Sequence, residues 1–179
     1  MTELAIHAAD RDIADELSEQ VRSAYHDRTP LRIVGGNTRA FYGRPVEGTR
    51  LNVAAHSGIV SYDPVELVVT VRAGTRLNAL NAALAEQNQM LPFEPPIFGD
   101  ASTIGGAVAT GMSGPRRPWA GAARDFVLGT RVITQEGKLL RFGGEVMKNV
   151  AGYDLSRMMA GAQGTLGVLA DISFKVLPI

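Results

Sequence analysis

Three glycine-rich segments hold the residues whose types and spacing could do chemistry. The first, residues 33–39, reads Ile-Val-Gly-Gly-Asn-Thr-Arg and places a glycine turn directly after an apolar run. Consecutive backbone N–H groups in such a turn can bind an anion, and glycine lets the backbone approach a ligand closely. An ordinary tight turn is the alternative for Gly35 and Gly36 taken alone.

The second segment, residues 99–114, combines a helix start with a run of small residues. Ser102 or Thr103 can cap a helix whose free N–H groups and positive dipole suit a pyrophosphate. Gly105 and Gly106 would lie in the first turn of that helix, where each costs about 1 kcal/mol relative to alanine. A ligand lying against the bare backbone explains that cost, and packing of a helix on a sheet through small residues is the alternative.

The third segment is residues 148–155, followed by Gly-Thr-Leu-Gly-Val at 164–168. Gly152 suits a strained loop, and Asp154 suits a helix N-cap. The second stretch could bring a strand backbone against a flat aromatic ring. A dinucleotide is the ligand that would use all of these segments. None of them contains the G-x-G-x-x-G fingerprint, so a Rossmann NAD site is not predicted.

The composition limits the class of protein. The chain has 179 residues, of which 45% are apolar and 20% charged, as in folded globular proteins. Lysine plus arginine equals aspartate plus glutamate at 18 each, so no nucleic-acid partner is expected. The absence of cysteine excludes a disulfide, a thiolate nucleophile and an Fe–S cluster of the chain's own, and three scattered histidines predict no metal site.

The same sequence predicts where the protein works. Its first residues lack the apolar region of a signal peptide, and nowhere do about 18 apolar residues run together. We therefore expect a cytoplasmic protein without membrane insertion. Peripheral attachment to a membrane through partner proteins is the alternative.

The elements that must position the glycine-rich segments mix helices and strands. The apolar spacing predicts helices over residues 10–28, 75–89 and 154–160, with Thr75 as the N-cap of the second. Runs of β-branched and apolar residues predict strands at 31–34, 50–54, 65–72, 126–134, 138–142 and 168–176. The fourth and fifth of these should form a hairpin. Without regular βαβ alternation, an α+β fold is expected rather than a doubly wound one.

Together these segments resemble the FAD-binding domains of the p-cresol methylhydroxylase/vanillyl-alcohol oxidase type, over almost the whole chain. The resemblance implies one FAD-binding domain spanning residues 1–179. It implies two lobes, a smaller N-terminal one over about residues 1–72 and a larger one over about residues 73–179. Members of this family continue into a C-terminal cap domain that shapes the substrate site, and we expect that domain to be absent from this chain.

The resemblance also implies which residues hold FAD. The first segment would bind the pyrophosphate, the second would bind FAD too, and the last would line the cofactor together with the following strand. The implied residues are Gly35, Gly36, Asn37, Thr38, Arg39, Ser102, Thr103, Ile104, Gly105, Gly106, Thr110, Ser113, Gly114, Gly164, Thr165, Gly167, Val168 and Ile172. Asn37 stands where some relatives carry a histidine bonded to the flavin, so FAD is expected to be held non-covalently.

Four longer stretches, residues 41–45, 114–119, 124–130 and 142–155, look like the FAD-binding subunits of glycolate oxidases. This resemblance implies a complex with a related flavoprotein subunit and an iron–sulfur subunit. The complex would oxidise a small 2-hydroxy acid, glycolate to glyoxylate, with electrons passing through the flavin. One alternative is an independent flavoenzyme for another hydroxy acid or alcohol. The other is a non-catalytic structural subunit with a degenerate FAD pocket.

No catalytic residue is predicted. Oxidation of a 2-hydroxy acid needs a base for the hydroxyl proton, a cation for the carboxylate and a flavin as hydride acceptor. Arg116 and Arg117 could clamp a carboxylate, with a solvated loop or a subunit contact as alternatives. The histidines lie outside the cofactor motifs and are expected at surface or structural positions: His7, His26 and His56.

Overall fold

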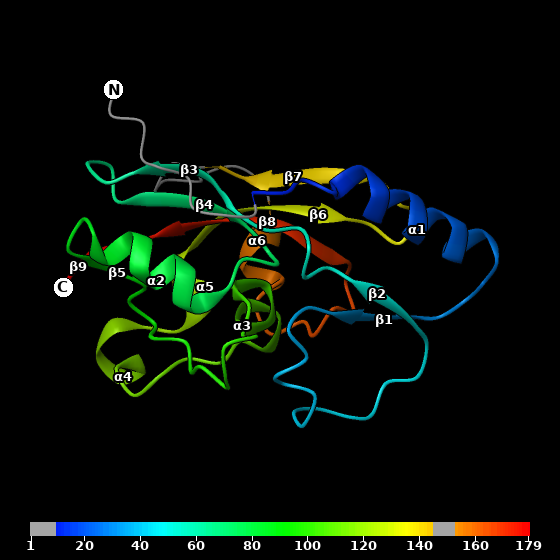
Figure 1. Cartoon of the computed structure of the whole chain (residues 1–179), viewed down its shortest axis with the longest axis horizontal. Helices are drawn as coiled ribbons and strands as arrows, with labels where there is room; N and C mark the ends of the chain where they lie inside the picture. Colours follow the sequence, from blue (N-terminus) through cyan, green and yellow to red (C-terminus); the bar gives the residue numbers. More distant parts are fainter. Residues whose placement is uncertain (1–9, 145–152) are drawn as a thin grey trace.

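A five-stranded sheet forms the centre of the computed structural model, which describes residues 10–144 and 153–179 (Figure 1). The strand order is β3-β4-β8-β6-β7, and all neighbours are antiparallel. The strands are β3 (Ile59–Asp63), β4 (Val68–Arg72), β6 (Val127–Ile133), β7 (Leu139–Gly143) and β8 (Val168–Lys175). Every residue of β8 except the last is buried, so other elements cover this central strand on both faces.

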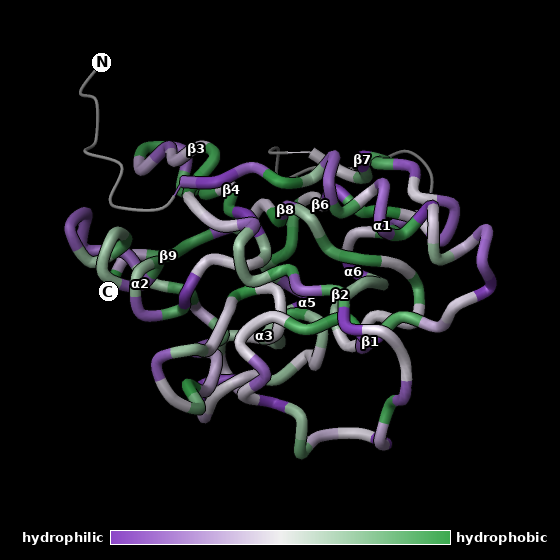
Figure 2. Tube along the Cα trace, turned by 45° about the vertical axis from the view of Figure 1, so that its right-hand side comes forward, coloured by the Kyte–Doolittle hydropathy of each residue, from purple (hydrophilic) through white to green (hydrophobic). Residues whose placement is uncertain are grey.

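Helices cover the sheet on both sides (Figure 1). The helices are α1 (Ala14–His26), α2 (Leu77–Ala85), α3 (Ile104–Thr110), α4 (Arg117–Ala120), α5 (Ala123–Phe126) and α6 (Leu155–Met158). The larger apolar cluster packs α2 and α3 against β4 and β8, through residues such as Val71, Leu80 and Ile172. The smaller one packs Leu17 and Val21 of α1 against the start of β8. Figure 2 shows hydrophobic stretches along β8 and its neighbours and hydrophilic ones at outer turns.

Two short pairs of strands lie outside the central sheet. β1 (Leu31–Val34) and β2 (Thr49–Asn52) run parallel and are joined by the loop of residues 35–48. β5 (Gln89–Met90) pairs with β9 (Leu177–Pro178) near the end of the chain. The mixture of helices with a mostly antiparallel sheet confirms the expected α+β class. No helix in the described parts of the chain is long and apolar enough to cross a membrane.

Elements that depend on local chemistry agree with the sequence-based predictions. The predicted hairpin is present, with β6 and β7 antiparallel. Helix α3 begins after Thr103, whose Oγ1 accepts the Gly106 N–H at 3.2 Å, and α6 begins after Asp154, whose carboxylate accepts the Arg157 N–H. The strand expected at 31–34 is β1.

The predicted cap of α2 is wrong. The N-cap residue is Arg76, which makes no side-chain cap. The Thr75 hydroxyl instead accepts the Gly58 N–H at 2.9 Å and lies 2.7 Å from the Arg72 carbonyl, to which it can donate. A tertiary contact has therefore taken the group that the helix start was expected to use.

The strand predicted over residues 65–72 is shorter, and β3 was not predicted. The Asp63 carboxylate accepts the N–H groups of Val65 and Glu66 and holds them in a turn, so β4 starts only at Val68. The expected division into lobes near residue 72 stays a prediction. Strands from both sides of that position share one sheet, because β4 pairs with β8 over its whole length.

Asp12 gives α1 its cap from outside the helix. Its Oδ1 accepts the Ala14 N–H at 2.9 Å, because the N-cap residue Ile13 has no side chain that can do so. That hydrogen bond lowers the pKa of the Asp12 carboxyl below its ordinary value, and the positive charge of Arg72 acts in the same direction. A carboxyl with a depressed folded-state pKa stabilises the fold above its unfolded pKa of about 3.9.

Asp12→Asn is therefore expected to lower the unfolding midpoint at neutral pH. The difference from wild type should shrink as the pH falls through the folded-state pKa, because the wild-type carboxylate is then protonated as well. Thermal unfolding followed by circular dichroism between about pH 7 and pH 2.5 measures this. A difference between the two proteins that stays constant across the range would contradict the capping role of the charge.

Candidate functional site

A cavity of about 510 Å³ lies between the loop after β1 and the first turns of α3. Its volume is within the range of sites for small molecules and cofactors. Four parts of the chain line it: all of residues 32–46, Val53 with Ala73, five residues between 103 and 110, and five residues between 159 and 169. The topology brings these parts together, since β1, α3 and the turn before β8 come from separate regions of the sequence.

Many of the residues predicted from the sequence line this cavity. They are Gly35, Gly36, Asn37, Thr38, Arg39, Thr103, Gly105, Gly106, Thr110, Gly164 and Gly167. The sequence reasoning missed other lining residues, among them Tyr42, Met159 and Gln163. Tyr42 lies in the stretch at 41–45, which resembles a known family, so the sequence held a signal for it. The sequence held none for Met159 and Gln163, because their place at the cavity depends on how distant loops meet.

Other predicted residues do not line the cavity: Ser102, Ile104, Ser113, Gly114, Thr165, Val168 and Ile172. Ile104 and Ile172 are fully buried in the core. Ser113 accepts the Ala123 N–H at 2.9 Å, and Thr165 donates to the Ala162 carbonyl at 2.7 Å. A contact of these residues with a cofactor stays a prediction. Residues 148–152 of the third segment lie outside the described residues.

Ser102 lies outside the cavity lining but holds two segments of the site together. Its hydroxyl accepts the Phe98 N–H at 3.0 Å and lies 3.1 Å from the Thr38 hydroxyl. The Arg76 guanidinium donates to the Ala101 carbonyl beside it. The glycine loop after β1 is thereby attached to the segment before α3, although the two are 64 residues apart.

The close approach of backbones explains two of the glycines. A Cβ on Gly36 would collide with the Ala101 carbonyl, and a Cβ on Gly105 would lie 2.7 Å from the Ala73 carbonyl oxygen. Both positions therefore need glycine for packing within the protein, which was the alternative interpretation for the segment at Gly105. Gly106 differs, because its Cβ would meet only side-chain atoms, Thr103 Oγ1 at 3.2 Å and Arg39 Nη1 at 3.5 Å.

Arg39 is the charged centre of the cavity wall. It is 8% exposed, Nη2 donates to the Pro96 carbonyl at 2.6 Å, and the guanidinium lies 5.4 Å from the centre of the Phe98 ring. Its buried Nε has no hydrogen-bond partner among the described residues. Burial lowers the pKa of Arg39, but a guanidinium keeps its proton in proteins.

The cavity is suited to an anion. Its charged lining residues within the described chain are Arg32, Arg39 and Arg44, and no carboxylate lines it. A buried cation with an unpartnered N–H is costly unless a ligand supplies the acceptor. Phosphate oxygens are good acceptors for a guanidinium and for the N–H groups of a glycine loop. The apolar side chains of Val53 and Leu169 provide surface for a ring.

Neither of the two described histidines lines this cavity. His56 is fully buried and held by hydrogen bonds, which makes it a structural residue as expected. His26 lies in the last turn of α1, and His7 is outside the described residues. Arg116 and Arg117 do not line the cavity either, and the Arg116 guanidinium lies 3.2 Å from the Met90 sulfur.

Known proteins similar to this chain include an FAD-binding family and subunits of glycolate oxidases. Residues 12–143 match the family model described as FAD binding domain. Over 167 residues the chain is 62% identical to glycolate oxidase subunit GlcE of Escherichia coli (strain K12), which covers 93% of this chain and 48% of that protein. It is 32% identical over 166 residues to glycolate oxidase subunit GlcD of Bacillus subtilis (strain 168), covering 92% and 35%.

The chain is also similar to a more distant relative and to a solved structure. The chain is 30% identical over 168 residues to a D-lactate dehydrogenase of Anaerostipes hadrus, covering 92% of this chain and 34% of that one. A solved structure of alkyldihydroxyacetonephosphate synthase superposes with a TM-score of 0.73 at 22% identity, over 92% of this chain and 30% of that chain. At this identity the likeness shows a shared fold. The chain spans about half the length of its GlcE relative, or 48%, and less of the others.

Proposed function

This chain belongs to the family of FAD binding domains, and on that premise we propose that it holds FAD for a glycolate oxidase-like complex. The complex would oxidise a small 2-hydroxy acid, glycolate to glyoxylate. The observation that carries the cofactor site is the buried Arg39 in a cavity that is lined by glycine-rich loops and, among the described residues, by no carboxylate. The substrate class is supported by the 62% identity to a glycolate oxidase subunit and by the D-lactate dehydrogenase relative.

Different residues of this chain would contact different parts of FAD. Arg39 and the N–H groups of residues 35–38 would hold the pyrophosphate. The first turn of α3 would lie beside it without donating, because the N–H groups of Ile104, Gly105 and Gly106 already donate to Thr75, Ala73 and Thr103. Gly164 and Gly167 would let the backbone lie against the cofactor, while Val53 and Leu169 exclude water from one side. The remaining residues predicted from the sequence would support these contacts from outside the cavity. Bound FAD supplies the acceptor for a hydride.

We propose that FAD is bound non-covalently. Asn37 offers an amide where a covalent bond to the flavin would need a nucleophile, and the chain contains no cysteine. The base and the carboxylate-binding cation for the substrate would come from other parts of the protein or from partners. A related flavoprotein subunit and an iron–sulfur subunit would receive the electrons. We place the assembly in the cytoplasm, with any membrane contact made through the partners.

The absorbance spectrum of the purified full-length protein tests the cofactor. We expect a yellow protein with a flavin spectrum, and acid precipitation should release the FAD into the supernatant. Colourless protein that takes up no FAD would instead support the structural subunit with a degenerate pocket. Flavin that stays with the precipitate would contradict non-covalent binding.

Anaerobic addition of glycolate tests the activity. We expect bleaching of the flavin absorbance when the partner subunits are present, because the remaining chemical groups are then supplied. Bleaching by another hydroxy acid or an alcohol with the isolated subunit would favour an independent flavoenzyme. D-lactate is a suitable comparison substrate, since a relative is a D-lactate dehydrogenase.

A further inference from the structure

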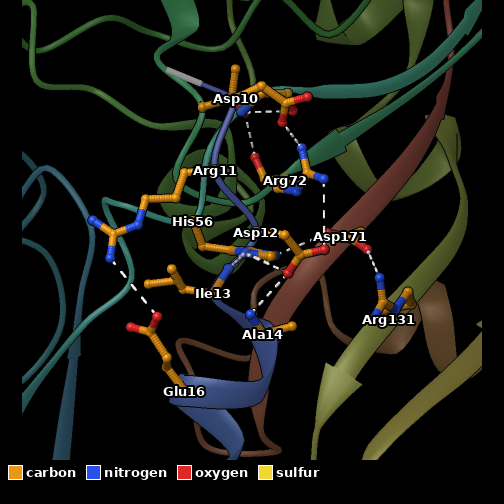
Figure 3. A network of polar contacts seen from close by, with 12 residues as sticks. Asp10, Arg11, Asp12, Ile13, Ala14, Glu16, His56, Arg72, Arg131 and Asp171 are labelled. Atoms are coloured by element: carbon orange, nitrogen blue, oxygen red, sulfur yellow. Dashed lines mark hydrogen bonds and ion pairs between the residues drawn. The ribbon is translucent and has the colours of Figure 1, made fainter.

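A network of polar side chains surrounds the fully buried His56 (Figure 3). His56 is fully buried, its Nδ1 accepts the Ile13 N–H at 3.1 Å, and its Nε2 lies 3.1 Å from Asp171 Oδ1. A backbone N–H can only donate, so Nδ1 is unprotonated and Nε2 of the neutral ring carries the proton. One imidazole thus connects the start of α1 to the central strand β8.

A bulge in β8 aims Asp171 at this histidine. Arg131 pairs with Asp171 but Val132 pairs with Leu169, so Ala170 is an extra residue in the ladder. Bulges redirect neighbouring side chains. Asp171 is 3% exposed, and its second oxygen accepts from Arg131 Nη1 at 2.7 Å. Its carboxylate is therefore satisfied on both sides only while His56 is present.

The backbone of His56 is packed against the turn after β4. Its carbonyl accepts the Gly74 N–H at 2.8 Å, and its N–H donates to the Val53 carbonyl at 3.1 Å. A Cβ on Gly74 would lie 2.5 to 2.6 Å from the carbonyl oxygens of Val53, Ala54 and His56. Movement of residue 56 would therefore move the turn at Gly74 with it.

That turn is part of the cavity floor. Ala73 and Val53 line the cavity. The Ala73 N–H donates to the Ala170 carbonyl of the bulge at 2.7 Å, and the Ala73 carbonyl accepts the Gly105 N–H at 2.8 Å. Gly105 also lines the cavity, in the first turn of α3. A continuous set of hydrogen bonds therefore connects His56 to the first turn of α3, beside the proposed pyrophosphate site.

We propose that His56, with Asp171, is a positioning residue for the FAD site. It does not line the cavity. It sets the place of Val53, Ala73 and Gly105 by holding the end of β4 against the bulge of β8. This inference rests on the proposed function, because it assigns the histidine to the geometry of the same cofactor site.

Paired measurements of FAD affinity and stability on the full-length protein test this role. His56→Ala leaves the Asp171 carboxylate and the Ile13 N–H without their partner, so the cavity floor can relax. We expect FAD to bind about tenfold more weakly, by flavin fluorescence titration of the apoprotein. His56→Gln can still donate to Asp171, and it should recover most of the affinity.

Thr70→Val is the matched control. The Thr70 and Ser173 hydroxyls are 2.8 Å apart and connect the same strands, β4 and β8, but neither residue lines the cavity. This variant should lower the unfolding midpoint and leave FAD affinity unchanged. If His56→Ala does not fold, Asp171→Asn replaces it in the same comparison.

The outcomes separate the two proposals. Wild-type affinity in the folded His56→Ala or Asp171→Asn protein would overturn the positioning role. An equal loss of affinity in Thr70→Val would do so too, since the effect would then follow stability alone. Failure of the wild-type protein to bind FAD would overturn the proposed function itself.

Discussion

Gly36→Ala is expected to weaken FAD binding by about 100-fold, because an added methyl group cannot be placed without separating two loops. The new Cβ would collide with the Ala101 carbonyl and approach Arg76 Nη1 at 3.2 Å. The glycine loop would have to move away from the segment before α3, and Arg39 would move with it. Equilibrium titration of the apoprotein with FAD measures the loss.

Gly129→Ala is the control for this substitution. Its Cβ would also meet a carbonyl oxygen, that of Gly144 at 2.6 Å, but Gly129 lies in β6 and does not line the cavity. It should lower the unfolding midpoint and leave FAD affinity nearly unchanged. If both variants lost affinity in proportion to their loss of stability, the special role of the glycine loop would be refuted.

Arg39→Gln is expected to weaken FAD binding by roughly 10- to 150-fold, the equivalent of about 1.5–3 kcal/mol for a hydrogen bond to a charged group. The physical reason is that the guanidinium is largely buried in the cavity wall, so water competes little for a hydrogen bond from it to a phosphate oxygen. ADP should lose affinity by a similar factor. Riboflavin, which has no phosphate, should bind each protein equally.

Although Arg39→Gln should weaken FAD binding, it should not destabilise the protein without FAD. Burying Arg39 without an anion costs free energy, so Arg39→Gln should leave the unfolding midpoint of the apoprotein unchanged or raise it. Arg50→Gln is the control, because it removes the same charge from an exposed position of β2 outside the cavity. Equal losses of FAD affinity in the two variants would indicate a general charge effect instead of a contact at Arg39.

The sequence predicted best what neighbouring residues decide among themselves. The hairpin of β6 and β7 follows from its turn chemistry, and the caps of α3 and α6 follow from Thr103 and Asp154. Strand β3 was missed because its side chains are mostly exposed and its stability comes from pairing with β4. The cap at Thr75 was wrong because Gly58, 17 residues away, competes for the same hydroxyl.

The sequence alone determined the family, the cofactor class and most of the segments that meet at the cavity. It could do so because a long motif or a glycine turn consists of consecutive residues. Only the tertiary structure decided what each glycine is for. Gly36 and Gly105 are required by approaching protein backbones, whereas Gly106 faces side chains at the cavity. The burial of Arg39 and the place of His56 were also decided there, because both depend on residues distant in the sequence.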